Sequence, residues 1–302
     1  MIHSVPARAD AAGCETVEGA AAAALRAHVL GYGGFRSASG NAVPHRLLPI
    51  SVAALIVDFA EEKAVVTGPR AVTTTDGPTR WGQGVTVGLT PAGVTALFGL
   101  PMRELVGQTL RLDELPGGPI ADLPERLSGA ADWPSRFRLL DDIVARCLGL
   151  PSTRPVPPAA RRRGDVAGAP PGGRCGTAET GPTGSAGSAG RADGLAMAAW
   201  SSLQRADGRL RVGELAVELG VGRRGLEREF RAAFGLSPGA VGRIARFQRA
   251  VQLIGAGVGL AEVAADSGYA DQPHLSRETR AMAGVTPGEL RAFVQYRPMA
   301  TA

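Results

Sequence analysis

A segment near the C-terminus of the chain occurs twice, and this repeat constrains the fold more than any other feature. Leu226–Gly239 recurs in diverged form as Leu275–Gly288, at a constant offset of 49 residues. Leucine, arginine, glycine and proline residues occupy matching positions in the two copies. A match this extensive is not expected by chance, so one structural unit appears twice.

The residues upstream of each copy repeat as well. Glu214–Gly220 corresponds to Glu262–Gly268, at an offset that is one residue shorter. Each unit therefore consists of a short helix with small and apolar residues, a turn containing glycine, and a second helix with apolar and basic faces. This order predicts a helix-turn-helix, a motif that places its second helix in the major groove of DNA.

The first unit separates into core and surface positions. Leu226, Phe230 and Phe234 follow helical spacing and are predicted to face inward, so the side chains between them point outward. Trp200 and Phe247 are also predicted to be core, because large apolar residues are usually buried. The candidate DNA contacts of this unit are Arg223, Arg224, Glu227 and Arg228.

In the second unit the candidate contacts lie at or near the start of the second helix, which Asp271 is placed to cap. A recognition helix presents its N-terminal residues to base edges, where arginine suits guanine and glutamine suits adenine. The candidate contacts of this unit are Asp271, Gln272, Pro273, His274, Ser276 and Arg277.

Some of these side chains have more than one interpretation. An exposed arginine is usually only solvated, but Arg228 and Arg277 occupy the same place in both copies, which favours contact with bases or phosphates. Glu227 either accepts a hydrogen bond from cytosine or pairs with Arg223 or Arg231, which lie one helical turn away.

The two units are predicted to be joined by a helix. Ser237-Pro238 and Thr286-Pro287 each combine an N-cap residue with proline at the first helical position. The joining helix, from Ser237 to about Ile254, would be roughly 27 Å long. A spacer of that length can hold two recognition helices near the ~34 Å separation of successive major-groove faces.

The sequence from about Leu195 to Leu290 closely resembles the AraC/XylS family of bacterial transcriptional regulators. The resemblance implies that exposed residues of both second helices contact double-stranded promoter DNA, without a cofactor. It leaves RNA polymerase, a small-molecule effector and a second copy of the chain open as further partners. The matching segments are Glu214–Gly220, Leu226–Phe230, Gly235–Pro238, Arg246–Ala250, Gly268–Gln272, His274–Arg277 and Gly284–Pro287.

The second unit departs from the family pattern in its core. Thr279 stands where the family normally has a large aromatic residue, as at Phe230, and Ala283 stands at the position of Phe234. We therefore expect a thinner core in the second unit. Gly222 replaces the usual serine at the N-cap of the first recognition helix, at a cost of only a few tenths of a kcal/mol.

Length and composition predict an α+β multidomain protein. The 302 residues, 44% of them hydrophobic, suffice for two domains and a linker. The formal net charge of +5 comes from the linker and the C-terminal region, as phosphate binding requires. No stretch approaches 18 apolar residues and no signal peptide is evident, so we expect a cytoplasmic protein without a membrane partner.

Residues 151–193 are rich in proline, glycine, serine and arginine, which predicts a disordered linker between two independent domains. Arg161–Arg163 within it is more typical of a solvated charge run than of a phosphate contact. The expected organisation is an N-terminal tail (1–24), a sensory or dimerisation domain (25–150), this linker, and a DNA-binding domain (194–302).

The N-terminal domain is predicted to be β-rich, with helices at its end and an all-α domain following the linker. Gly68–Arg70, Val87–Gly93 and Leu97–Pro101 resemble the poorly characterised domain that precedes the AraC module in many high-GC bacterial regulators, which implies a cupin-like sensory or oligomerising domain. The predicted strands are Val29–Phe35, Val52–Phe59, Ala64–Thr67, Arg70–Thr75 and Gly84–Leu89, and the predicted helices are Pro91–Phe98 and Ser135–Leu148.

Catalysis and metal binding find little support in the sequence. No nucleophile motif is present, and Gly31–Gly34 lacks the spacing of a phosphate-binding loop. Trp81 is more typical of packing than of a ligand pocket. No metal-binding spacing connects the histidines, which are His3, His28, His45 and the isolated His274.

Two alternatives to sequence-specific regulation remain at this point. A DNA-repair methyltransferase fused to the C-terminal module would need a metal-held cysteine cluster, whereas Cys14, Cys147 and Cys175 are scattered and predicted to be free thiols. A low-specificity architectural DNA-binding protein would discriminate weakly between specific and random DNA.

Overall fold

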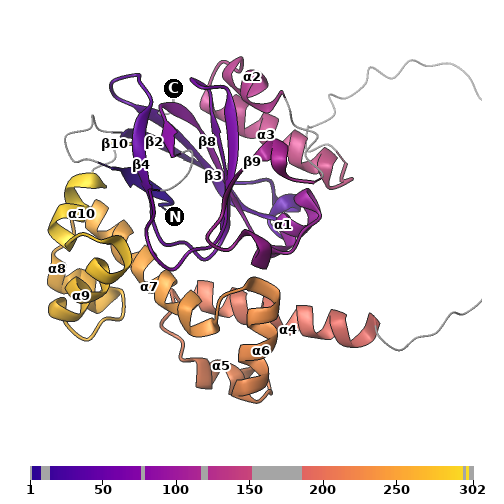
Figure 1. Cartoon of the computed structure of the whole chain (residues 1–302), viewed down its shortest axis with the longest axis vertical. Coiled ribbons are helices and arrows are strands. Elements are labelled where there is room, and N and C mark those ends of the chain that lie inside the picture. Colours follow the sequence, from indigo (N-terminus) through magenta and orange to yellow (C-terminus); the bar gives the residue numbers. More distant parts are fainter. Residues whose placement is uncertain are drawn as a thin grey trace, which may run out of the picture.

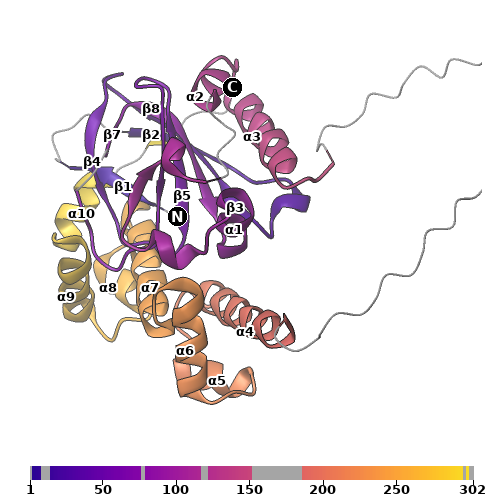
Figure 2. The same cartoon turned by 45° about the vertical axis from the view of Figure 1, so that its right-hand side comes forward.

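The computed structural model describes residues 2–7, 14–75, 79–116, 122–151, 186–294 and 297–298. A β-rich part formed by the N-terminal half packs against a helical part formed by the C-terminal half (Figure 1). The two views show the orange and yellow helices along one side of the β-rich part (Figure 2). The architecture is the expected one, with a β-rich domain followed by an all-α domain.

The β-rich part contains two sheets. One has three strands in the order β1-β4-β7, and the other has seven in the order β10-β2-β3-β8-β5-β6-β9. Neighbouring strands are antiparallel, apart from β10, which pairs parallel with β2. The strands are β1 Ser4–Pro6, β2 Cys14–Gly19, β3 Val29–Ser37, β4 Val43–Leu47, β5 Ala53–Asp58, β6 Lys63–Thr67, β7 Arg80–Trp81, β8 Gln83–Leu89, β9 Thr109–Arg111 and β10 Arg297–Pro298.

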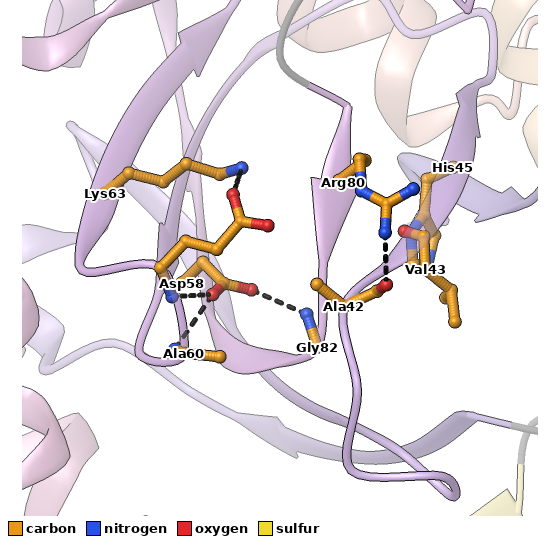
Figure 3. A network of polar contacts seen from close by, with 9 residues as sticks. Ala42, Val43, His45, Asp58, Ala60, Lys63, Arg80 and Gly82 are labelled. Atoms are coloured by element: carbon orange, nitrogen blue, oxygen red, sulfur yellow. Dashed lines mark hydrogen bonds and ion pairs between the residues drawn. The ribbon is translucent and has the colours of Figure 1, made fainter.

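Strand β5 lies inside the larger sheet, between β8 and β6, and all its residues are buried. At its end, the carboxylate of Asp58 accepts hydrogen bonds from the backbone amides of Ala60 and Glu61 at 2.9 Å and of Gly82 at 2.7 Å (Figure 3). Asp58 is 1% exposed, and these donors replace the water that the buried carboxylate lost. The contact ties the β5–β6 turn to the corner between β7 and β8.

Short helices cover the β-rich part. The two predicted helices are present with hydroxyl or carboxylate caps, since Thr90 accepts from the amide of Gly93 and Asp132 from that of Ser135. The helical segments are η1 Ala23–Leu25, α1 Pro91–Phe98, η2 Met102–Leu105, η3 Leu112–Glu114, α2 Leu123–Ser128 and α3 Trp133–Cys147.

Two expectations for the N-terminal half were wrong, and several strands were not predicted. Residues 1–24 are not a tail, because β1 and β2 pair there with β4 and β3. Arg70–Thr75 is not a strand but forms isolated bridges, with Arg70 opposite Ile50 and Thr74 opposite Leu47. The strands β1, β2, β4, β7 and β9 were not predicted, because strand formation depends on the partner strand and on burial as much as on the residues themselves.

The C-terminal half contains the two predicted helix-turn-helix units, α5–α6 and α8–α9, joined by α7. The first helix of this half, α4, begins at Ala186 and therefore within the predicted linker, residues 151–193. Residues 152–185, which include Arg161–Arg163 and Cys175, lie outside the described residues. The helices are α4 Ala186–Arg205, α5 Val212–Glu218, α6 Arg223–Phe234, α7 Pro238–Gly255, α8 Leu260–Asp266, α9 Gln272–Ala283 and α10 Pro287–Phe293. No helix in the described part of the chain is long and apolar enough to cross a bilayer.

The two domains are not independent, contrary to the expectation from the linker. Leu226 and Phe230 of the first unit belong to a hydrophobic cluster that also includes core residues of the β-rich part. The second unit shares its cluster with Val5 and Leu48 of that part. Buried apolar surface therefore holds each unit against the N-terminal domain.

The core of the second unit contains a polar group without a partner. Thr279 is 0% exposed, and its hydroxyl makes no hydrogen bond among the described residues. A buried polar group of this kind costs about 1 to 3 kcal/mol. Replacing Thr279 by valine is therefore expected to raise the free energy of unfolding by about 1 kcal/mol, as measured by urea denaturation.

Thr286→Val is the matched control, because the Thr286 hydroxyl caps α10 by accepting from the amide of Glu289 at 3.2 Å. Loss of a cap costs about 0.5 to 2 kcal/mol, so the same substitution is expected to have the opposite sign there. A destabilisation by Thr279→Val as large as that by Thr286→Val would contradict the assignment.

Candidate nucleic-acid interface

The first recognition helix, α6, has one buried face and one exposed face. Leu226, Phe230 and Phe234 are at most 3% exposed, as predicted from their spacing. Gly222 is the N-cap and provides no side-chain cap. Of the candidate contacts on this helix, Arg223, Arg224 and Arg228 are exposed and Glu227 is half-buried.

Charged side chains on α6 pair with one another. Arg223 donates from Nε to Oε1 of Glu227 at 3.0 Å. Of the two interpretations of Glu227, this structure therefore shows the ion pair with Arg223. Arg228 donates to Oε1 of Glu229 from Nε at 3.1 Å and from Nη2 at 2.8 Å. Exposed pairs of this kind contribute at most about 1 kcal/mol, so they leave both arginines able to exchange partners for a phosphate or a base.

A shallow surface hollow lies along the exposed face of α6. Arg224 contributes to it, and this arginine has no ion-pair partner within the described part of the chain. The hollow thus combines the paired Arg228 with two arginines, Arg224 and Arg231, that have no ion-pair partner among the described residues. Its lining residues are Arg224, Glu227, Arg228, Arg231 and Ala232.

The second recognition helix, α9, begins as the sequence predicts. Asp271 accepts from the backbone amide of His274 at 2.6 Å and is thereby engaged as the N-cap. The ring of His274 packs edge-on against Tyr269 at 5.3 Å, and its Nδ1 accepts from the amide of Ala270 at 3.3 Å. Gln272, Pro273 and Arg277 are exposed, whereas His274 and Ser276 are half-buried.

The joining helix α7 is anchored to the second unit by an ion pair. Arg243 donates to Glu278 of α9 from Nε at 2.6 Å and from Nη2 at 3.1 Å, and the Arg243 pKa is raised by this hydrogen-bonded pairing. Arg246 of α7 donates to the carbonyl of Gly208, just before α5, at 2.8 Å. Sequence reasoning missed this role of Arg243 and Glu278, because pairing across 35 residues leaves no local pattern.

Comparison with known families identifies the helical region. The sequence model of the helix-turn-helix domain family matches residues 215–292, which span both units and α7. The C-terminal region is an AraC-type helix-turn-helix domain. The match does not include the N-terminal domain, whose cupin-like character stays a prediction. A search of curated protein sequences finds no match to the chain.

Solved structures similar to the chain include two that correspond to the AraC-type domain alone. The C-terminal domain of AraT, a response regulator from Geobacillus stearothermophilus, is 22% identical, with a TM-score of 0.33, and covers 36% of this chain and 91% of its own. An AraC-type DNA-binding domain-containing transcriptional regulator from Chromobacterium violaceum is 28% identical, with a TM-score of 0.31, and covers 36% and 96%. ToxT from Vibrio cholerae with an unsaturated fatty acid bound is 12% identical, with a TM-score of 0.38, and the match covers 98% of this chain and 95% of the ToxT chain.

The N-terminal domain and the AraC-type domain together line a partly open cavity of about 680 Å³. Trp81, which is 1% exposed, lines it with His45, whose ring stacks on the indole at 5.3 Å. The AraC-type domain contributes Gln252 and Gly255 of α7 and the adjacent Val294. Trp81 therefore both packs and lines a pocket, and the cavity touches α7, the helix that joins the two helix-turn-helix units.

The cysteines of the N-terminal domain are poorly suited to nucleophilic chemistry. Burial raises the pKa of the Cys14 thiol to about 11, and burial also raises the pKa of Cys147. The thiolate is the reactive form, so both groups are protonated at neutral pH. Within the described ranges, no group of three or more His, Cys, Asp or Glu side chains is arranged to hold a metal ion.

Mild acid is expected to destabilise the domain around this cavity. Burial lowers the pKa of His45 to about 4 and that of His3 to about 3, from the ordinary 6.5. Below pH 6.5 the unfolded chain therefore binds more protons than the folded chain does. The contribution of the two neutral histidines to the free energy of unfolding is complete above pH 6.5, and it is lost as the pH falls toward 4 and then 3.

Urea unfolding at about pH 7.5 and about pH 5 measures this loss. His45→Phe keeps a ring against Trp81 but does not titrate, so the variant is expected to lose less stability between the two pH values. An equal loss in the wild type and the variant would contradict the assignment to His45.

Proposed function

We propose that this protein is a sequence-specific DNA-binding transcriptional regulator whose two helix-turn-helix units read adjacent major-groove segments of a promoter. The observation that carries the proposal is the duplicated unit around α7, with the N-terminal parts of α6 and α9 exposed and their opposite faces buried. The AraC-type identity of the domain supports DNA binding. The basic surface of α6 supports attraction to phosphates.

The proposed contacts differ in role. Arg228 and Arg277 hold equivalent exposed positions and are assigned to bases, while Gln272 is suited to adenine. Asp271 is engaged by the His274 amide, so we assign it to positioning the helix start rather than to a base. The remaining proposed contacts with bases or phosphates are Arg223, Arg224, Glu227, Pro273, His274 and Ser276.

Selection from random duplex DNA by the full-length chain tests the proposal. At near-physiological salt, we expect enrichment of two half-sites whose centres lie about 10 base pairs apart. Enrichment of one short motif alone would mean that only one of the two helix-turn-helix units recognises a DNA sequence. No enrichment over the input would contradict sequence-specific recognition and favour an architectural protein.

We further propose that the N-terminal domain senses a small molecule, dimerises, or does both. The cavity supports sensing, because its 680 Å³ falls in the range of small-molecule sites and its wall includes α7. A ligand bound there would share binding free energy with DNA. A metabolite that raises the melting temperature and also shifts the DNA dissociation constant would support this coupling, whereas a melting shift without a change in DNA affinity would argue against it.

The methyltransferase alternative is disfavoured by the protonated thiols of Cys14 and Cys147. Incubation with alkylated DNA, followed by mass measurement of the protein, tests it. We expect no methyl transfer to any of the three cysteines, and stoichiometric transfer would overturn this conclusion.

A further inference from the structure

The carboxyl end of the first recognition helix contacts the N-terminal domain. Arg103 of η2 donates from Nη1 to the carbonyl of Ala232, in the last turn of α6, at 3.3 Å. The helix ends at Gly235, where a Cβ would lie 2.6 Å from Cγ2 of Val106 and 3.1 Å from Cα of Arg103. The N-terminal domain thus packs directly against this helix end.

The carboxyl end of the second recognition helix contacts the same domain. Arg46 of β4 donates from Nη1 to the carbonyl of Ala283 at 3.2 Å, and the Thr73 amide donates to the carbonyl of Met282 at 2.8 Å. The Arg46 guanidinium also lies over the ring of Phe293, 5.9 Å from its centroid. Two segments of the N-terminal domain therefore hold this helix end.

The two contacts lie at equivalent helix ends of the repeat, although the contacted carbonyl of Ala283 corresponds in position to Phe234 and not to Ala232. Gly235 and Gly284 occupy matching positions, and both adopt the left-handed conformation that ends a helix, with φ of 73° and 71°. The last carbonyls of a helix lack partners within it and carry partial negative charge, so an arginine is a suitable partner at each end. One domain thus uses Arg103 and Arg46 for the same purpose on two copies of one unit.

Two further helices, α7 and α4, are also hydrogen-bonded to the N-terminal domain. Gln248 of α7 is 8% exposed, and its amide donates from Nε2 to the carbonyls of Ile2 at 3.0 Å and Pro49 at 2.7 Å. On α4, the Trp200 indole donates to the carbonyl of Ser51 at 3.4 Å. The N-terminal domain therefore contacts both recognition helices and two further helices, α4 and α7.

We propose that Arg46 and Arg103 determine the spacing of the two half-sites that the chain reads, by docking the ends of both recognition helices on one scaffold. This inference rests on the proposed reading of two half-sites. Groups held by a rigid support keep their relative geometry better than groups joined by one helix alone. Loss of both arginines removes one side-chain contact from each helix end, while the shared apolar clusters and the Gln248 contacts remain. The domains therefore stay docked, and the helix ends become less tightly positioned.

The test compares the full-length wild type with the Arg46→Ala/Arg103→Ala double variant on a series of duplexes. The series contains the selected bipartite site, the same site with one base pair added or removed between its halves, and one half-site alone. A shift of one base pair rotates one half-site by about a tenth of a turn. We expect this to weaken wild-type binding about tenfold, and to weaken binding by the double variant only about two- to threefold.

Affinity for the single half-site distinguishes an effect on spacing from the loss of a direct DNA contact by Arg46 or Arg103. We expect this affinity to be the same in the wild type and the double variant. Arg80→Ala is the matched control, because Arg80 also donates to a main-chain carbonyl, that of Ala42 at 2.9 Å, but within its own domain. If the double variant unfolds, Arg46→Lys/Arg103→Lys replaces it, since lysine keeps the charge without the planar fork.

Three results would overturn the inference: an unchanged spacing preference in the variant, a weakened affinity for the single half-site, or tighter binding to every duplex. The last of these would mean that docking restrains DNA binding instead of organising it. Failure of the wild type to prefer any sequence would instead overturn the proposed function itself.

Discussion

Replacing both Arg228 and Arg277 by alanine is expected to weaken binding to the selected DNA by about 2 to 6 kcal/mol. Each arginine that contacts a guanine contributes about 1 to 3 kcal/mol, and contributions from well-separated positions add approximately. The Arg228 side chain is 76% exposed, so its pairing with Glu229 is readily exchanged for a base. Arg277 is exposed and has no ion-pair partner among the residues that the structure describes.

Titration of labelled duplex by the full-length variants measures this loss, with a scrambled duplex alongside. A base contact lowers affinity for the selected sequence more than for the scrambled one, whereas a phosphate contact lowers both and reduces the salt dependence. Arg138→Ala is the control for each single replacement, since it removes one arginine charge from an exposed site on α3. Unchanged specific affinity in the double variant would show that neither arginine reads DNA.

Phe230→Ala is expected to lower the free energy of unfolding by about 3 to 5 kcal/mol. Phe230 is 0% exposed and lies edge-on to Phe234, with ring centroids 4.6 Å apart. Its removal leaves a cavity in a cluster that the first unit shares with the N-terminal domain. The effect should therefore extend beyond the helix-turn-helix unit.

Urea unfolding followed by tryptophan fluorescence and by circular dichroism measures this effect. Val217→Ala, at a position that is 82% exposed, is expected to change stability by less than about 0.5 kcal/mol. A loss below about 1 kcal/mol for Phe230→Ala would mean that the core of the first unit tolerates the cavity, contrary to the packing described above.

The C-terminal region was predictable because its signals are local. Leu226, Phe230 and Phe234 repeat at helical spacing, and Asp271 and Thr286 cap helices as their neighbours indicate. Helix periods and caps depend on residues within a few positions of one another. The same local logic placed the candidate contacts on the exposed side of α6 and at the start of α9.

The N-terminal domain was less predictable because its pairings are non-local. Val5 of β1 pairs opposite Arg46, so three buried residues near the N-terminus belong to a sheet and not to a tail. Strand formation depends on the partner strand and on burial as much as on the residue itself. Short strands such as β1 and β7 therefore gave no pattern of their own.

The contacts between domains were also beyond the reach of sequence patterns. Arg46 meets Ala283, and Gln248 meets Ile2, across more than two hundred residues. The linker composition suggested independence, but composition says nothing about surfaces that pack elsewhere in the chain. The contacts of the second recognition helix with the N-terminal domain, and the residues that line the cavity, could therefore be seen only in the folded structure.

The central claim is that this chain recognises DNA sequence through its duplicated unit. The most direct measurement is the ratio of the dissociation constants of the full-length protein for a scrambled duplex and for the selected bipartite duplex, at near-physiological salt. We predict a ratio of about 10³ or more, as for specific regulators. A ratio near one would contradict the claim, because binding would then depend on the phosphate backbone alone.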